Sequence, residues 1–229
     1  MKVCLPVLIL IVCLPCFVFS QNVGDFQYTE GNGEITITGY GGSEKNVVIP
    51  SAINGMPVVG IGERAFFNKQ LSGITLPNSI TTIRGAAFRQ NLLVSVVLPD
   101  SITEIGTSAF RNNRLTSVTL SNSLTKINGE AFRNNQLTGI IIPRGVTIID
   151  STAFNENNLS SVTLPDTLTQ IKSSAFANNP LTNITLPNSI TTIGENAFKR
   201  NQLTRVVVPN SVRNLNETAF DPDVVITRE

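Results

Sequence analysis

Apolar residues recur along this chain with a period of 22 residues. Each repeat contains an Ala-Phe pair, and the phenylalanines of these pairs are Phe66, Phe88, Phe110, Phe132, Phe154, Phe176, Phe198 and Phe220. A leucine follows five residues after each of the first seven phenylalanines, and aliphatic residues follow eight and ten residues after it. A fixed short period of this kind predicts a solenoid, because stacked coils together bury apolar columns that a single coil leaves open to water.

The spacing within one repeat predicts a short strand followed by turns. Val118 and Leu120 alternate with Ser117 and Thr119, a period of two that is typical of a strand with one buried face. In most repeats a proline comes next and ends the strand, since proline has no N–H to donate to a ladder. Twenty-two residues are too few for a strand, a crossover and a full helix. We therefore predict a β-rich solenoid of about eight coils, with a parallel sheet on one side and short strands or 3₁₀ turns on the return leg.

The two ends of the array depart from the repeat and predict caps. Residues 21–46 lack the unit, but residues 34–38 alternate and follow the turn-like Gly31-Asn32-Gly33, which predicts a β-hairpin cap. The repeat array itself covers residues 47–220. Residues 221–229 hold a final apolar stretch, and we expect it to form a C-terminal cap strand that shields the last coil.

Residues 1–20 are typical of an export signal. Lys2 precedes an uncharged apolar run, and Ser20 stands before a cleavage point at Gln21. One alternative is an uncleaved membrane anchor, although the run is short for a span and contains two prolines. Another alternative is a lipoprotein with lipid on Cys13 or Cys16, although neither cysteine follows the small residue usual at such sites.

Composition favours binding over catalysis. The chain has no histidine, so the commonest general base and metal ligand is absent, and its three cysteines all lie in the first sixteen residues. No catalytic constellation, cofactor motif or metal-ligand spacing can be assembled from the rest, and we predict neither enzyme activity nor a cofactor. Of the 17 basic residues, Lys2 leaves with the signal, so 16 remain against 16 acidic residues, and this neutrality argues against nucleic acid as a partner.

The repeat resembles the BspA-like, or treponemal-type, leucine-rich repeats. The run Ile184-Thr-Leu-Pro-Asn-Ser-Ile-Thr-Thr-Ile-Gly-Glu-Asn-Ala-Phe198 carries the likeness, which extends from about Val47 to Phe220. Ser121 departs from the pattern by replacing the proline, and 22 residues is one short of the commonest unit. The resemblance implies a right-handed, curved solenoid with the parallel sheet on its concave side. It also implies a secreted or surface protein, in a family often linked to adhesion and to contact with host cells.

The outward residues of the predicted strands are the candidate partner-binding site on the concave sheet. They are small, nearly uncharged and partly apolar: Ser95, Val97, Ser117, Thr119, Ile141, Ser161, Thr163, Asn183, Thr185, Arg205 and Val207. Solenoids tend to bind partners on this face. The alternative is that threonine and valine stand there only because they suit an exposed strand.

Two polar columns follow the phenylalanines. Arg89, Arg111 and Arg133 stand directly after Phe in consecutive repeats and could form a basic edge for an acidic or sulfated partner, unless carboxylates such as Glu104 and Glu130 pair with them. Asparagines stand three residues after Phe, and we interpret them as a structural ladder that satisfies backbone groups of adjacent coils. They are Asn91, Asn113, Asn135, Asn157, Asn179 and Asn201.

Together these features predict an exported protein that binds another protein, by adhesion to host or matrix proteins through the concave sheet. It would be a monomer without a transmembrane segment once the signal is cleaved, located at the cell surface, secreted or in the periplasm. The alternatives are a periplasmic scaffolding solenoid and, less favoured, a carrier of a small hydrophobic ligand.

Overall fold

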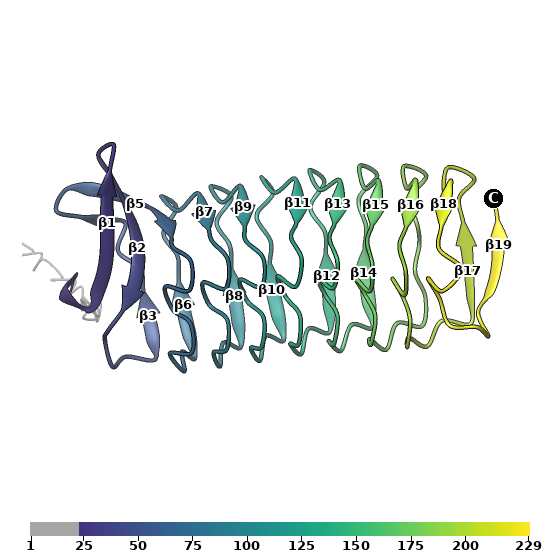
Figure 1. The fold of residues 1–229 in the computed structure, drawn as a ribbon, viewed down its shortest axis with the longest axis horizontal. Coiled ribbons are helices and arrows are strands. Elements are labelled where there is room, and N and C mark those ends of the chain that lie inside the picture. The colour runs from purple at the N-terminus through teal and green to yellow at the C-terminus, as the bar shows by residue number, and fades with distance from the viewer. Residues whose placement is uncertain (1–22) are drawn as a thin grey trace, which may run out of the picture.

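The repeats fold into coils that stack along one axis (Figure 1). A computed structural model describes residues 23–229, so the predicted signal peptide and its cysteines Cys13 and Cys16 lie outside the described residues. The chain forms a β-solenoid of about nine turns of roughly 22 residues, with parallel sheets and almost no helix. The predicted fold class is thus confirmed. The last strand follows the eighth Ala-Phe pair and begins a further turn beyond the eight coils expected.

Two series of strands run along the solenoid. The first series holds the alternating segment of each repeat and comprises β3 (Asn46–Val48), β6 (Gly73–Thr75), β8 (Ser95–Val97), β10 (Ser117–Thr119), β12 (Gly139–Ile141), β14 (Ser161–Thr163), β17 (Arg205–Val208) and β19 (Val225–Arg228). The second series lies on the return leg and comprises β5 (Met56–Ile61), β7 (Thr82–Ile83), β9 (Glu104–Ile105), β11 (Lys126–Ile127), β13 (Ile148–Ile149), β15 (Gln170–Ile171), β16 (Thr192–Ile193) and β18 (Asn214–Leu215). The return leg is therefore short strand and turn.

The phenylalanine column forms a continuous aromatic stack in the core. Neighbouring ring centroids lie 5.1–5.5 Å apart, and the ring planes differ by no more than 15°. The rings from Phe66 to Phe198 have no solvent exposure, and Phe220 is 4% exposed. Each ring thus buries both of its faces against neighbouring coils, as the 22-residue period predicted.

The asparagine column is the structural ladder that the sequence predicted. Each Asn Nδ2 donates to two phenylalanine carbonyls, one in its own coil and one in the coil before, at 2.7–3.1 Å. Each Asn Oδ1 accepts the N–H of the leucine in the coil before at 3.0–3.2 Å. Five of the six side chains are buried. They satisfy backbone groups that would otherwise be unpaired in the interior.

The turn around each Ala-Phe pair uses left-handed backbone at non-glycine residues. In seven consecutive coils, the residues two before and two after the phenylalanine have φ between 53° and 60°. In the fifth of these coils they are Thr152 and Glu156. Left-handed backbone is costly for most side chains and most of all for β-branched ones, so these turns store strain that the stacked core offsets.

The strands of the first series pair two at a time. The parallel pairs are β3 with β6, β8 with β10, β12 with β14 and β17 with β19. Parallel strands were predicted on this side, but one continuous sheet was expected. These strands are three or four residues long, so each pair makes few ladder bonds. The second series instead joins into two longer ladders, β5-β7-β9 and β11-β13-β15-β16-β18.

Residues 183–185 were predicted as a strand and are not one, and Pro180 accounts for part of this difference. In the coil before and the coil after, the equivalent residues Asn158 and Gln202 donate their N–H to Leu137 and Leu181 one coil earlier. Pro180 has no N–H to donate, so the connection into residues 183–185 lacks this bond.

A β-hairpin closes the N-terminal end of the described chain, as predicted. It consists of β1 (Phe26–Gly31) and β2 (Glu34–Tyr40), joined by Asn32 and Gly33 with φ of 54° and 76°. A single 3₁₀ turn, η1 (Val23–Asp25), precedes it, and the short β4 (Ala52–Ile53) pairs with β5. β2 pairs parallel with β5, and the ring of Tyr40 lies 5.5 Å from that of Phe66, so the hairpin covers the first ring of the stack.

At the other end, β19 continues the first series beyond the last Ala-Phe pair. It pairs parallel with β17, and Phe220 beneath it stays buried. Ile226 occupies the inward register opposite Val206 but is 44% exposed. The predicted strand is therefore present, and its own inward side chain is only partly covered.

Truncating one ring of the stack should destabilise the whole array. Phe132→Ala is expected to lower the free energy of unfolding by about 3–5 kcal/mol, because Phe132 is fully buried between two rings. Chemical denaturation of both proteins measures the change. A mutant that unfolds at the same denaturant concentration as the parent would contradict the stacking role.

Relieving backbone strain in a turn should do the opposite. Thr152 is β-branched and has φ of 57°. Because asparagine adopts left-handed backbone more readily, Thr152→Asn is expected to raise the free energy of unfolding by roughly 0.5–1 kcal/mol. Thr138→Asn is the control, since Thr138 is exposed and does not occupy a left-handed position. An equal gain in the control would mean that strain is not the cause.

Candidate functional site

The outward surface of the first strand series, together with residues 183–185, is called the strand face here. All eleven residues predicted for the partner-binding surface are solvent-exposed on it. Ile141 and Val97 are 73% and 67% exposed, the largest values among the exposed large hydrophobic residues that the structure describes. Arg205 is the only charged residue among the eleven. The face therefore offers apolar side chains set among small hydroxyl and amide groups.

The positions of the apolar residues on the strand face correspond to the pairing of the strands. In each two-stranded unit, one strand carries an aliphatic side chain directly opposite a threonine of its partner. The pairs are Val48 with Thr75, Val97 with Thr119, Ile141 with Thr163, and Val207 with Thr227. Opposed β-branched side chains stabilise a strand pair, so part of this pattern belongs to the sheet itself. Val48 was missed by the sequence analysis because its coil departs from the regular repeat.

Two shallow depressions mark the strand face. One has a volume of about 590 Å³ and brings together Thr119, Ile141, Ser161 and Thr163. The other, of about 530 Å³, brings together Asn183, Thr185, Arg205 and Val207, with Glu229 at its side. Ser95, Val97 and Ser117 lie outside both. Glu229 could not be expected from the sequence, because it follows the last repeat.

The second depression lies where strand pairing fails. Residues 183–185 form no ladder with β14 or β17, whereas β17 pairs with β19 on its other side. The strand face of this coil therefore has no ladder bonds to its neighbours, although β16 on the return leg pairs with β15 and β18. The irregular backbone that follows Pro180 thus coincides with a recess in the face.

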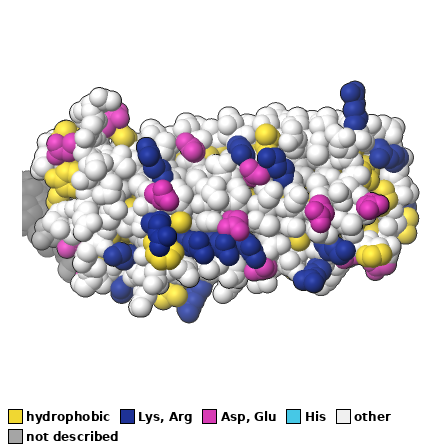
Figure 2. Space-filling view, in the orientation of Figure 1, with side chains coloured by type: hydrophobic (Ala, Val, Ile, Leu, Met, Phe, Trp, Pro, Cys, Tyr) yellow, Lys and Arg dark blue, Asp and Glu magenta, His cyan; other side chains and the backbone are white. Residues whose placement is uncertain are grey.

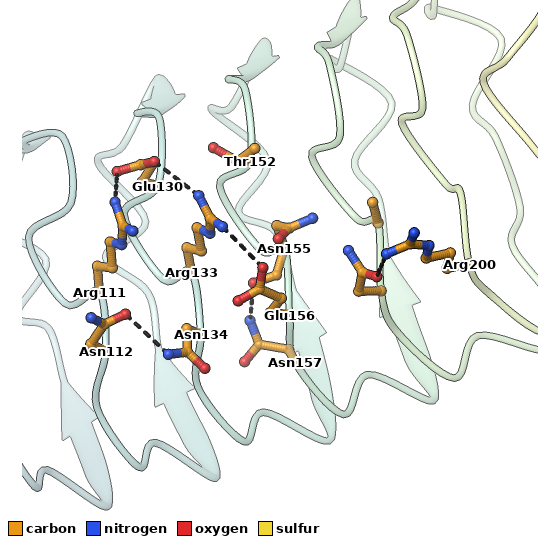
Figure 3. Close-up of polar contacts among 12 residues, drawn as sticks. Arg111, Asn112, Glu130, Arg133, Asn134, Thr152, Asn155, Glu156, Asn157 and Arg200 are labelled. Atoms are coloured by element: carbon orange, nitrogen blue, oxygen red, sulfur yellow. Dashed lines mark hydrogen bonds and ion pairs between the residues drawn. The ribbon is translucent and has the colours of Figure 1, made fainter.

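The second candidate surface is the arginine edge, formed by Arg89, Arg111 and Arg133. A row of basic side chains runs along the long axis of the molecule on the face shown in Figure 2. Glu130 accepts hydrogen bonds from both Arg111 and Arg133, at 3.2 Å from Arg133, and so bridges two coils (Figure 3). Glu156 also pairs with Arg133 at 2.9 Å. Glu130 therefore pairs as in the alternative to a free basic edge, whereas no ion pair of Glu104 is found in residues 23–229.

The charges on the arginine edge shift one another's pKa. Partial burial alone would raise the pKa of Glu130, but hydrogen bonds from Ser108, Arg111 and Arg133 outweigh it and hold the pKa below its ordinary value. Burial would likewise lower the pKa of Arg133, and its bonds to Glu156 and Glu130 raise it instead. Glu156 was missed by the sequence analysis. A usable signal was that a carboxylate stands at a turn position occupied by glutamine or asparagine in the three preceding repeats.

No three His, Cys, Asp or Glu side chains of residues 23–229 lie together in a way that could hold a metal ion. In the same range, no helix is long and apolar enough to cross a membrane.

The Glu130 bridge should make stability depend on pH. Glu130→Gln is expected to lower the free energy of unfolding at pH 7 by about 1 kcal/mol, because it removes the charge between two partly exposed arginines. A carboxyl with a depressed pKa stabilises the fold above its ordinary pKa and loses this effect as pH falls through the folded-state pKa. The difference between the two proteins should thus shrink towards zero below about pH 4. Glu104→Gln serves as the control, and a pH-independent difference would contradict the bridge.

Similarity to known proteins is concentrated in the repeat. The family model described as "BspA type Leucine rich repeat region (6 copies)" matches residues 43–158 and 126–225. No curated protein sequence matches the chain.

Solved structures of bacterial leucine-rich repeat proteins share the fold. A leucine-rich cell surface protein of Faecalibacterium prausnitzii is 24% identical with a TM-score of 0.70, covering 91% of this chain and 76% of its own. A leucine-rich repeat protein of Bacteroides ovatus is 22% identical with a TM-score of 0.68, covering 92% and 67%. The leucine-rich repeat protein of T. pallidum is 24% identical with a TM-score of 0.56, covering 80% and 90%. With its repeat matched over most of its length and its coils built as described above, the chain belongs to the BspA-type leucine-rich repeat family.

Proposed function

We propose that this protein is an exported binding module that holds a protein partner on its strand face and thereby attaches to host or matrix proteins. The observation that carries the proposal is the exposure of Val97 and Ile141 on a surface made mostly of small, uncharged residues. An exposed aliphatic side chain gains free energy when a partner covers it, and the small neighbours leave room for close approach.

Several further features support a protein partner. The repeat fold itself is a protein-interaction scaffold, and a solenoid with a fixed interior can vary its outward positions freely. The two depressions give a partner's side chains places to enter. The Faecalibacterium prausnitzii relative is a cell surface protein, and together with the predicted export signal this supports the proposal that the protein is exported.

Charge placed on the strand face should weaken this binding. In a surface-capture assay on immobilised matrix proteins, Val97→Glu combined with Ile141→Glu is expected to weaken binding at least tenfold. Each substitution removes an aliphatic contact worth on the order of 1.5–3 kcal/mol and adds a charge that a partner must desolvate. Both side chains are largely exposed, so folding should be unaffected, and a thermal melt checks this.

The matched control is Thr107→Glu combined with Thr125→Glu, two exposed residues outside the first strand series. It adds the same charge elsewhere. An equal loss in both double mutants would show that net charge and not the strand face governs binding. If no matrix protein binds the parent chain, the adhesion proposal fails and the periplasmic scaffold becomes the better explanation.

A further inference from the structure

The three arginines of the arginine edge differ in how far their charges are compensated. Arg133 pairs with two carboxylates, Glu130 and Glu156, and Arg111 pairs with Glu130 alone. The side chain of Arg89 makes no ion pair and no hydrogen bond with any residue in 23–229. The Nε of all three arginines is buried without a partner, so the difference between them lies in their terminal nitrogens. Uncompensated positive charge thus collects at one end of the row.

Neighbouring residues on the open side of Arg89 do not supply the missing anion. In the coil before, the position equivalent to Arg89 is Phe67, and the guanidinium of Arg64 lies 4.2 Å from the centroid of its ring. A cation stacked on an aromatic ring adds positive charge to this end of the row. The coils before and after Arg89 thus each carry a cation on this edge, Arg64 and Arg111.

The molecule itself shows how a carboxylate sits between two of these arginines. Glu130 stands two residues before Phe132 and reaches Arg111 of the coil before and Arg133 of its own coil (Figure 3). One coil earlier, the same turn position holds Ser108, between Arg89 and Arg111. Ser108 and Glu130 have nearly the same φ, 59° and 57°, and Arg111 and Arg133 donate their backbone N–H to them in the same way. The coil of Ser108 thus has the same turn backbone as the coil of Glu130 but lacks the carboxylate.

Ser108 does not take over the role of that carboxylate. Its hydroxyl donates to Glu130 at 2.7 Å and so turns towards the occupied bridge. The guanidinium of Arg111 bonds Glu130 through one nitrogen, and its Nε is buried without a partner. The terminal guanidinium nitrogens of Arg89 and the second terminal nitrogen of Arg111 have no partner within residues 23–229, so they are the donors that can bind an oxyanion from outside. Guanidinium groups bind carboxylates in strong, charge-assisted pairs.

From this repeated geometry we infer that Arg89 and Arg111 form a binding site for a carboxylate of an acidic protein segment, in the place that Glu130 fills one coil further on. The guest is a glutamate or aspartate side chain because the molecule's own template is a side-chain carboxylate. The site lies off the strand face, so it gives a partner a second and independent point of attachment. It stands or falls separately from the adhesion proposed above.

The test is a titration of the ¹⁵N-labelled protein with a capped tetraglutamate peptide at low ionic strength. The arginine Nε–H resonances report the outcome, and those of Arg89 and Arg111 are expected to shift in a saturable way. Arg89→Gln should weaken binding at least tenfold, whereas Arg144→Gln, which removes an exposed arginine elsewhere, should not. A capped tetraglutamine peptide should produce no shift.

The sharpest variant is Ser108→Glu, which supplies the missing carboxylate from within. It is expected to occupy the site and to weaken binding of the glutamate peptide at least tenfold. Ser174→Glu is the matched control. Ser174 occupies the same left-handed turn position, with φ of 56°, but the residues equivalent to the two arginines beside it are Asn155 and Ala177.

Three results would overturn the proposal. The first is the absence of any shift in the parent protein. The second is equal weakening by Ser108→Glu and Ser174→Glu, which would mean that only net charge matters. The third is a response to inorganic sulfate without a response to tetraglutamate, which would mean that the site takes a compact oxyanion and not an acidic protein segment.

Discussion

The buried asparagine amide is the interaction on which the rest of this solenoid depends. One side chain donates to the phenylalanine carbonyls of two coils and accepts an N–H from the earlier coil, so each asparagine joins neighbouring turns at three backbone groups. Those groups lie beside the phenylalanine stack, where water cannot reach them. Replacing one amide with an apolar group would leave the leucine N–H unpaired, at a cost of roughly 1–3 kcal/mol, and would leave each phenylalanine carbonyl with only one of its two asparagine donors. This constraint fixes the repeat at one length, because a coil with one residue more or fewer would misplace its amide.

The interior of every coil is therefore nearly the same, and the coils differ mainly in their outward-facing residues. Asp150 accepts contacts from Lys126 in the coil before and Lys172 in the coil after, so it links three turns on the return leg much as Glu130 links two on the arginine edge. Partial burial would raise the pKa of Asp150, and its hydrogen bonds from Lys126, Ser151 and Lys172 lower it instead. Such bridges occur in some coils and not in others. The outer surface therefore differs from coil to coil, while the interior is nearly constant.

The columns of the repeat predicted nearly the whole interior of the structure. The stacked phenylalanines, the asparagine ladder and the hairpin with its Asn32-Gly33 turn all follow from spacing and from the known conformational preferences of these residues. Pairing of the first strand series could not be predicted in the same way. Ladder bonds between three-residue strands depend on small differences in backbone position, and the relevant signal, Pro180, lies three residues before the segment it affects. Ser121 is a milder case: it replaces the expected proline, and its hydroxyl bonds the carbonyl of Ile102 one coil earlier.

The candidate site was predictable only as a set of exposed positions. Alternation placed the eleven residues on one face, but it could not tell which of them share a depression, since this depends on the junctions between coils. On the arginine edge, spacing indicated a row, and Glu130 was identified as a partner. The positive charges along that row are compensated unequally because Ser108 stands where the next coil has Glu130. The sequence shows this difference, but its meaning becomes clear only when the two turns are seen to have the same backbone conformation.

The hairpin at the N-terminal end also bears on how the chain assembles. Its two strands are adjacent in sequence and pair with each other, whereas each coil beyond it finds its main contacts one repeat away. A newly made coil therefore needs only the coil before it as a template, and Tyr40 already offers the first ring a surface. Such a chain can fold in the order in which it is synthesised, one coil after another. Each step closes only a short loop and does not require the C-terminal coils to be present.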